Sequence, residues 1–309
     1  MYHTVFITGA NSGIGLATTK VFLENNWNVV ATARNLDAAT DLQKLATVNE
    51  ARLLTLPLDL FSVETFQPAL EAAIGKFGKV DVLINNAGYG QYGMMEALDI
   101  EDYRRQFEVN VFGPISLTKQ FLTHCFTTRK TSSPSQVIYV SSGAAHFGLP
   151  LSSAYNGSKA ALNLFAESVS YELGALDPPV TVKIVVIHGG VHSTNFLHST
   201  NSALVLEELE ATHVSPAHPR KIEMMGRYGA YAAHVLRAFG SIAEGRIPVE
   251  IPAEKIFTAA TDGTRKLRYF IGGSGTDRPM TVRMEGLKRE DDEETCDDRY
   301  MRWMRERFA

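Results

Sequence analysis

Short runs of β-branched and other apolar residues alternate with longer segments of helical periodicity over the first two thirds of the chain. The predicted strands cover residues 4–8, 28–33, 52–56, 81–85, 136–141 and 180–187. The predicted helices between them cover residues 14–26, 37–47, 62–77, 101–126 and 155–175. Apolar strands that alternate with helices are typical of a parallel sheet buried between two helical layers. The pattern therefore predicts a Rossmann-type, doubly wound α/β fold with a parallel sheet flanked by helices.

The strand and helix alternation stops after residue 194. Segments 203–212 and 223–244 have helical periodicity, and the second carries a broad stripe of Met, Tyr, Val, Leu and Phe side chains. Such a stripe is more typical of core or of a partner-facing surface than of a substrate lid alone. Residues 265–273 (RKLRYFIGG) predict a last strand that ends at paired glycines.

No internal repeat or low-complexity linker divides the chain. We therefore expect one Rossmann domain over residues 1–275, with a substrate lid at about 195–250, and a charged C-terminal tail at 276–309. In that tail, seven of the nine residues 290–298 are acidic, and an arginine-rich aromatic segment follows them. An acidic run ahead of a terminal helix is the simpler interpretation, and a tail that docks a partner is the alternative.

The composition is that of an ordinary soluble protein, with 309 residues, 45% apolar residues and a net charge of -4. This balance gives no electrostatic reason to expect nucleic acid or an anionic membrane as a partner. The two cysteines, Cys125 and Cys296, are far apart in sequence and suggest neither a disulfide framework nor a metal site. The first residues lack a targeting pattern, and no stretch reaches the roughly 20 apolar residues of a membrane span. We therefore expect a cytoplasmic protein without a membrane span or a bound metal.

A glycine-rich loop, Thr8-Gly9-Ala10-Asn11-Ser12-Gly13-Ile14-Gly15, follows the first predicted strand and opens the first predicted helix. Glycines allow a sharp turn and let a phosphate approach the helix N-terminus, where free N–H groups and the helix dipole favour an anion. The spacing departs from the G-x-G-x-x-G fingerprint, and the loop lacks the lysine that a P-loop requires. The loop therefore predicts a phosphate site at the N-terminus of this helix.

The second predicted strand ends in NVVATARN, where a dinucleotide-binding fold contacts the adenosine ribose. A carboxylate at this position would bind the ribose hydroxyls of NAD and repel a 2'-phosphate. Ala33 supplies no carboxylate, and Arg34 follows it with a guanidinium group that suits a phosphate. The sequence favours NADP(H) over NAD(H), with a solvated surface arginine as the alternative interpretation of Arg34.

The spacing of the glycine loop resembles that of the short-chain dehydrogenase/reductase superfamily, and further stretches match that family in order. They are Pro57-Leu58-Asp59-Leu60, Asn85-Asn86-Ala87-Gly88, Asn110 within VNVFG, Ser142 at the end of QVIYVSS, and Tyr155 with Lys159 in AYNGSK. The resemblance is strong over residues 3–194 and weak over 195–275. Alone, a Tyr and a Lys four residues apart on a helix would more often be an ordinary polar pair on the helix surface.

The resemblance implies a catalytic set and a cofactor-binding set. Tyr155 would be the general acid, Lys159 would favour its phenolate and hold the nicotinamide ribose, Ser142 would bind the substrate oxygen, and Asn110 would order a water. The implied cofactor-binding residues are Gly9, Asn11, Ser12, Gly13, Ile14, Gly15, Arg34, Asp59, Asn86, Ala87, Gly88, Tyr155, Lys159 and Thr194. Asp59 would contact the adenine ring, and Thr194 would contact the nicotinamide amide.

One departure from the family pattern follows the strand at 180–187. The family commonly has a proline and a glycine there, followed by a threonine, whereas this chain reads His188-Gly189-Gly190-Val191-His192-Ser193-Thr194. A glycine in place of a proline raises the conformational entropy of the unfolded chain, which lowers the stability of the folded loop by roughly 1 kcal/mol. The two histidines have no carboxylate or cysteine at metal-binding spacing, so we interpret them as loop or substrate-pocket residues.

The motifs imply an NADPH-dependent reductase of ketones or aldehydes, or the reverse alcohol dehydrogenase. The pattern TARN together with NVFG resembles the steroid- and retinol-dehydrogenase-like branch, which implies an apolar or polycyclic small molecule as substrate. Two alternatives stay open: a non-redox isomerase or dehydratase that uses the same Tyr/Lys pair, and an NADP-binding sensor. Family members often form dimers or tetramers through helices at 101–126 and 155–175, so a homo-oligomer is a further expectation.

Overall fold

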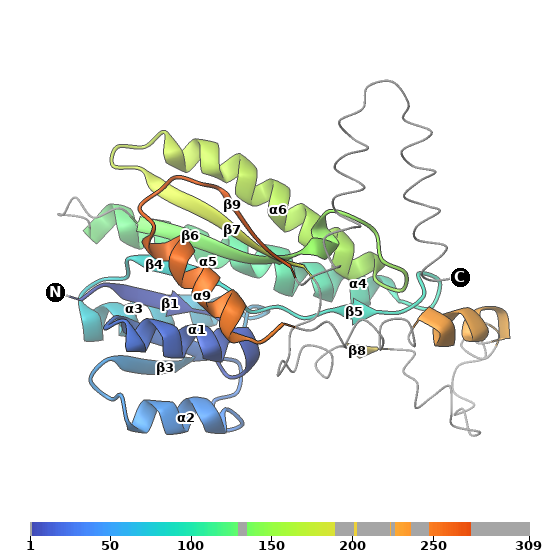
Figure 1. Ribbon diagram of the computed structural model, residues 1–309, viewed down its shortest axis with the longest axis horizontal. Coiled ribbons are helices and arrows are strands. Elements are labelled where there is room, and N and C mark those ends of the chain that lie inside the picture. The colour runs from blue at the N-terminus through green and yellow to red at the C-terminus, as the bar shows by residue number, and fades with distance from the viewer. Residues whose placement is uncertain are drawn as a thin grey trace.

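The computed structural model describes residues 2–128, 135–188, 201–202, 223, 226–235 and 247–272. Within them lies a parallel sheet of seven strands in the order β3-β2-β1-β4-β6-β7-β9 (Figure 1). The strands are β1 (Thr4–Ile7), β2 (Asn28–Ala33), β3 (Leu53–Pro57), β4 (Val82–Asn85), β6 (Ser135–Ser142), β7 (Val180–His188) and β9 (Arg268–Gly272). The Rossmann-type fold is confirmed. The strand order reverses between β1 and β4, and such a switch point opens a ligand-binding crevice at the carboxyl ends of the strands.

Helices cover both faces of the sheet. Successive strand residues point to opposite sides, so each face carries apolar side chains that a helical layer must bury. Val5 and Ile7 belong to one hydrophobic core, and Phe6 between them belongs to the other. The first core is covered by α1 (Gly13–Glu24), α2 (Thr40–Thr47) and α9 (Glu250–Thr261). The second core is covered by α3 (Phe66–Phe77), which a short 3-10 turn (Val63–Thr65) precedes, by α5 (Gly113–Thr128) and by α6 (Ser153–Gly174).

The segment predicted as one helix at 101–126 is interrupted, so that prediction was wrong in detail. It forms α4 (Ile100–Phe107), a π-helical turn (Glu108–Phe112) and then α5. A π turn inserts one extra residue without ending the helix, so the apolar periodicity on either side gave no sign of it. This wider turn carries Asn110, whose side chain is buried.

Three elements were not predicted. The helix α9 packs against α1, where the rings of Phe257 and Phe22 meet edge to face with centroids 5.0 Å apart. Two short strands, β5 (Gln91–Tyr92) and β8 (Asn201–Ser202), pair in parallel outside the main sheet. The strand β9, by contrast, was predicted, and it lies inside the predicted range 265–273.

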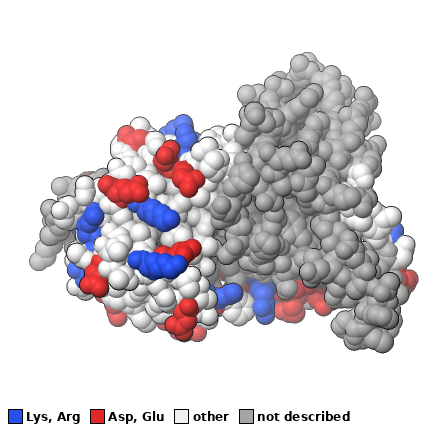
Figure 2. All heavy atoms as spheres, turned by 60° about the horizontal axis from the view of Figure 1, so that its bottom comes forward, with Lys and Arg blue, Asp and Glu red and all other residues white. Residues whose placement is uncertain are grey.

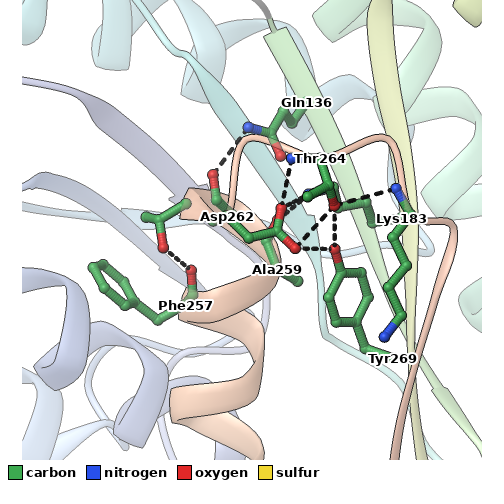
Figure 3. Close-up of polar contacts among 10 residues, drawn as sticks. Gln136, Lys183, Phe257, Ala259, Asp262, Thr264 and Tyr269 are labelled. Atoms are coloured by element: carbon green, nitrogen blue, oxygen red, sulfur yellow. Dashed lines mark hydrogen bonds and ion pairs between the residues drawn. The ribbon is translucent and has the colours of Figure 1, made fainter.

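An ion pair between the buried Lys183 and the partly exposed Asp262 links the end of α9 to β7, and Tyr269 of β9 joins it (Figure 3). The Lys183 side chain is fully buried in β7 and donates hydrogen bonds to the Ala259 carbonyl at 2.5 Å and to Asp262 Oδ1 at 2.6 Å. Asp262 also accepts from Tyr269 on β9 and from the Thr264 backbone at 3.0 Å. Burial opposes ionisation of Asp262, but these hydrogen bonds outweigh it and hold its pKa well below the usual value.

Acidic and basic side chains are interspersed on the described part of the face shown in Figure 2. Among the described residues, no helix is both long and apolar enough to cross a membrane. The lid predicted at about 195–250 lies only partly within the described residues, and the tail at 276–309 lies outside them. The proposed domain boundary at residue 275 therefore stays a prediction.

Candidate active site

The glycine loop and the Asn85–Gly88 segment pack directly against each other at the carboxyl ends of β1 and β4. Gly9 has a φ of +66°, and a Cβ on it would lie 2.9 Å from Ala87 Cα. A Cβ on Gly15 would lie 2.1 Å from the Gly9 carbonyl oxygen. The Asn86 side chain donates to the carbonyls of Thr8 and Gly9 at 2.8 and 3.2 Å. These contacts leave no room for larger side chains, which explains the glycines and the asparagine together.

The N-terminus of α1 follows this loop and has the features of a phosphate site. The helix begins at Gly13 after Ser12 in an extended conformation, and its first turn contains no acidic residue. Ile14 packs against the core, whereas Asn11 is exposed. Free N–H groups on a concave glycine loop fit the diphosphate of a dinucleotide. The residues present therefore fit a nicotinamide dinucleotide.

Arg34 follows the end of β2 directly, and Asp59 lies two residues after the end of β3. Arg34 is exposed, and it makes no ion pair or side-chain hydrogen bond within the described part of the chain. Asp59 Oδ1 accepts a hydrogen bond from the Phe61 backbone N–H at 3.0 Å, as in a local turn. The geometry thus places a free guanidinium group where an adenosine ribose is expected in this fold.

Ser142 and Tyr155 are brought together from the end of β6 and the first turn of α6. Their hydroxyl groups share a hydrogen bond, and Ser142 Oγ also accepts from the Ala144 backbone N–H at 3.2 Å. Burial raises the pKa of Tyr155 to about 12, and the hydrogen bond with Ser142 acts in the opposite direction. In this state Tyr155 is a neutral proton donor at physiological pH.

Lys159 lies one turn after Tyr155 on α6 and is also buried. Its Nζ donates to the Val140 carbonyl at 3.1 Å and lies 6.0 Å from the centre of the Tyr155 ring. Burial lowers the pKa of Lys159 to about 8. A Cβ on Gly88 would lie 3.1 Å from Asn110 Oδ1 and 3.7 Å from Lys159 Nζ, so these three residues are neighbours.

The Asn110 side chain is held by protein groups. Its amide nitrogen donates to the Tyr89 carbonyl at 2.9 Å and to Ser158 Oγ at 3.1 Å, and its oxygen accepts from the Tyr89 backbone N–H at 3.1 Å. Asn110 thus fixes the loop that follows Gly88. The predicted water at Asn110 stays a prediction, and Thr194 lies outside the described residues.

Two residues of the candidate site were not found from the sequence. Gln106 is fully buried on α4 and binds the backbone of the same loop as Asn110. The ring of Tyr92 on β5 lies beside the Tyr155 ring, with centroids 6.0 Å apart. A glutamine in an amphipathic helix and a tyrosine in a short loop carry no motif, so only the fold reveals them.

Comparison with known proteins identifies the family. The family model described as "short chain dehydrogenase" matches residues 3–204, which is more than half of the chain. The chain therefore belongs to the short-chain dehydrogenase family, whose members are oxidoreductases that use nicotinamide cofactors. The motifs quoted above, Thr194 included, all fall within the matched residues, and Thr194 alone among them lies outside the described residues.

Two curated relatives are similar to this chain over long stretches and not only at the motifs. An uncharacterised oxidoreductase of Schizosaccharomyces pombe is 34% identical over 198 residues, which cover 64% of this chain and 63% of the relative. An oxidoreductase of Botryotinia fuckeliana is 28% identical over 268 residues, which cover 86% of this chain and 88% of the relative. The chain thus spans less than two thirds of the first relative.

Solved structures share the fold over most of the chain. A short-chain dehydrogenase from Streptomyces avermitilis has a TM-score of 0.69 at 26% identity, over 93% of this chain and 96% of that one. An alcohol dehydrogenase from Thermococcus sibiricus complexed with 5-hydroxy-NADP has a TM-score of 0.64 at 20% identity, over 88% and 96%. A 3-ketoacyl-(acyl-carrier-protein) reductase from Brucella melitensis complexed with NADH has a TM-score of 0.66 at 20% identity, over 89% and 98%. The fold thus accommodates either form of the cofactor.

Proposed function

We propose that this protein is an NADPH-dependent oxidoreductase that reduces a ketone or aldehyde to an alcohol, or catalyses the reverse reaction. The observation that carries the proposal is the hydrogen bond between Ser142 and Tyr155, with Lys159 one helical turn away. These three side chains converge at the edge of the sheet where open α/β folds bind ligands. They lie next to a glycine loop whose shape fits a dinucleotide.

The cofactor would be held by residues from three parts of the fold. The backbone of Gly9–Gly15 would hold the diphosphate at the N-terminus of α1, and the Asn86–Gly88 segment would border the nicotinamide half. Arg34 supports the choice of NADPH, because an exposed guanidinium group with no partner among the described residues suits a 2'-phosphate. Asp59 and Thr194 would contact the adenine ring and the nicotinamide amide. When bound, NADPH supplies the hydride for the reduction.

The protein's own side chains supply position and the proton. Ser142 would donate a hydrogen bond to the substrate oxygen as negative charge develops there. Tyr155, neutral because burial raises its pKa to about 12, would transfer its hydroxyl proton to that oxygen. The Lys159 ammonium would stabilise the resulting phenolate. Asn110 would hold the loop that borders both groups, and a water near it would connect Lys159 to solvent.

For the substrate, we propose an apolar or polycyclic carbonyl compound. The stretches TARN and NVFG support this assignment through their resemblance to the steroid- and retinol-dehydrogenase-like branch. The aromatic side chain of Tyr92 beside Tyr155 is consistent with it, because an aromatic ring favours apolar ligands over strongly hydrated ones.

The test follows NADPH absorbance while the purified protein meets aldehydes, small ketones, steroids and polycyclic ketones. Tyr155→Phe and Lys159→Ala are assayed in parallel. The proposal predicts that NADPH is oxidised with at least one carbonyl compound and that both variants lose this activity. If NADPH binds and no carbonyl is reduced, but a substrate is isomerised or dehydrated without loss of cofactor, the non-redox alternative replaces it.

A further inference from the structure

The Tyr92 side chain faces the catalytic tyrosine, although no motif marks it. The ring centroids of Tyr92 and Tyr155 are 6.0 Å apart, and the ring planes are inclined by 35°. Tyr92 is partly exposed, whereas Tyr155 is buried. In the proposed complex a substrate oxygen would lie about 3 Å from the Tyr155 hydroxyl, so the groups on the carbonyl carbon would come near the Tyr92 ring.

Hydrogen bonds fix the backbone on both sides of Tyr92. The Gln91 backbone N–H donates to Gln106 Oε1 at 2.6 Å, and Gln106 Nε2 donates to the Tyr89 carbonyl at 2.8 Å. On the other side, the Gly93 backbone N–H donates to the Leu151 carbonyl at 2.8 Å. A fully buried glutamine that uses both ends of its amide on one loop restricts that loop strongly.

The strand β8 adds a third restraint. In the parallel pair of β5 and β8, Gln91 is opposite Asn201 and Tyr92 is opposite Ser202. Tyr92 is therefore held between α4, the start of α6 and β8, and all three restraints act on the backbone. A side chain on so fixed a backbone presents a constant surface to a ligand, which is what specificity requires.

The ring of Tyr92, rather than its hydroxyl group, is the feature suited to this position. Burial raises the pKa of Tyr92 well above its usual value, and the neighbouring Tyr155 adds to that effect. The Tyr92 hydroxyl therefore stays protonated throughout the physiological range and does not compete with Tyr155 as a base. What remains is a flat apolar surface with an electron-rich face.

We propose that Tyr92 is a specificity-determining residue whose ring, positioned by Gln106, selects carbonyl compounds that carry a flat aryl group on the carbonyl carbon. The inference rests on the proposed carbonyl reduction and names the substrate class of that same site. An aryl ring packed against the Tyr92 ring would gain an aromatic attraction beyond the burial of apolar area, whereas a saturated ring would gain only the burial. A preference of about fivefold for an aryl over a saturated ring of the same size follows.

The test compares acetophenone with methyl cyclohexyl ketone, which differ in having a flat or a puckered ring. The ratio of their kcat/KM values is measured for the wild type, Tyr92→Phe and Tyr92→Leu. Tyr92→Phe keeps the flat ring, and Tyr92→Leu keeps apolar bulk without it. Tyr171→Leu is the matched control, because Tyr171 lies on α6 with 70% of its side chain exposed. Thermal unfolding and NADPH binding are measured for every variant.

The inference predicts that the wild type, Tyr92→Phe and Tyr171→Leu prefer acetophenone by about fivefold and that Tyr92→Leu loses the preference, mainly through KM. Equal losses with both ketones in Tyr92→Leu would mean that Tyr92 is merely structural. A Tyr92→Phe variant as impaired as Tyr92→Leu would assign the role to the hydroxyl group. Either result overturns the inference while the reductase function stands.

Gln106→Leu tests the positioning step in the same assay, because it removes both hydrogen bonds to the loop and keeps a similar side-chain volume. We expect the preference to fall toward that of Tyr92→Leu, and an unchanged ratio would overturn the role of Gln106. If the wild type reduces neither ketone, the wider panel of aldehydes, steroids and polycyclic ketones decides the proposed function by itself. Ligand-observed NMR with the NADPH complex then decides the inference: equal binding of the two ketones overturns it, and a preference for acetophenone that Tyr92→Leu abolishes supports it.

Discussion

Lys159 Nζ lies 6.0 Å from the centre of the Tyr155 ring and is oriented by the Val140 carbonyl, 3.1 Å away on β6. An ammonium group has three N–H donors, and the hydrogen bond to Val140 uses one of them. In the proposed complex the other two are available for the nicotinamide ribose. Because both side chains are buried, their charges interact more strongly than they would in water. A phenolate formed at Tyr155 would therefore be stabilised by a charged Lys159.

Removal of the Tyr155 hydroxyl should abolish proton transfer and leave the fold intact. For Tyr155→Phe we expect kcat to fall by roughly two or more orders of magnitude, which is the usual effect of a positioned acid. NADPH affinity should change much less, because the ring and Lys159 remain. Steady-state kinetics and equilibrium binding of NADPH check the two parts, and a variant with wild-type kcat would exclude Tyr155 as the acid.

The rate of reduction should fall as the pH rises above about 8. Burial lowers the pKa of Lys159 to about 8, so the side chain is charged below that pH and neutral above it. Loss of the charge removes the group that stabilises the Tyr155 phenolate. The pH profile of kcat/KM reports this pKa in the free enzyme. In Lys159→Arg, whose guanidinium group stays charged, the fall near pH 8 should disappear even if the rate is lower; a fall that persists would point to another group.

Reversal of the charge at Arg34 should shift the cofactor preference from NADPH toward NADH. Charged hydrogen bonds contribute about 1.5–3 kcal/mol, so Arg34→Asp should reduce the ratio of kcat/KM for NADPH over NADH by about 10- to 150-fold. Lys20→Asp is the control, because Lys20 is exposed on α1, outside the predicted cofactor residues. An unchanged ratio in Arg34→Asp would show that Arg34 is a solvated surface residue.

Loss of the Asp262 carboxylate should destabilise the protein at neutral pH. In Asp262→Asn the fully buried Lys183 loses its charged partner, which typically costs about 3–5 kcal/mol. The exposed pair of Asp41 and Lys44 is the control, and Asp41→Asn should cost under about 1 kcal/mol. Denaturant unfolding at pH 7 compares them, and equal small losses would contradict the anchoring role of Lys183.

The ion pair of Asp262 and Lys183 also predicts how the stability of the protein changes with pH. The folded-state pKa of Asp262 lies well below its unfolded value, so its contribution to stability is fully present above pH 5 or so and is lost as the pH falls through the folded-state pKa. The free-energy difference between the wild type and Asp262→Asn should therefore shrink in acid. A difference that grows below about pH 4 would contradict this assignment.

Much of the fold was predictable because the strands are buried on both faces. Val5, Phe6 and Ile7 must all be apolar when one side chain enters one core and the next enters the other, so strand β1 is visible in the sequence. The segments that form the site were predictable for a related reason. Gly9, Gly15 and Asn86 fit one another so closely that their identities are constrained.

The remaining features depend on contacts between distant segments. The interruption at Asn110 leaves the helical periodicity unchanged on either side, so it has no local signature. Gln106 resembles any surface glutamine until the loop at Tyr89 is placed against it. The buried Lys183 lies in an apolar strand, where its partner Asp262 is 79 residues away. Such pairs follow from the tertiary structure rather than from any local pattern.

The most direct test of the proposed function follows the fate of the cofactor's hydrogen. NADPH that carries deuterium at the transferable position of the nicotinamide is incubated with a reducible ketone and the wild-type protein or Tyr155→Phe. The account predicts that the wild type places deuterium on the former carbonyl carbon, with one cofactor oxidised for each alcohol formed, and that Tyr155→Phe forms almost none. Product that forms without deuterium, while the cofactor stays reduced, would contradict the account.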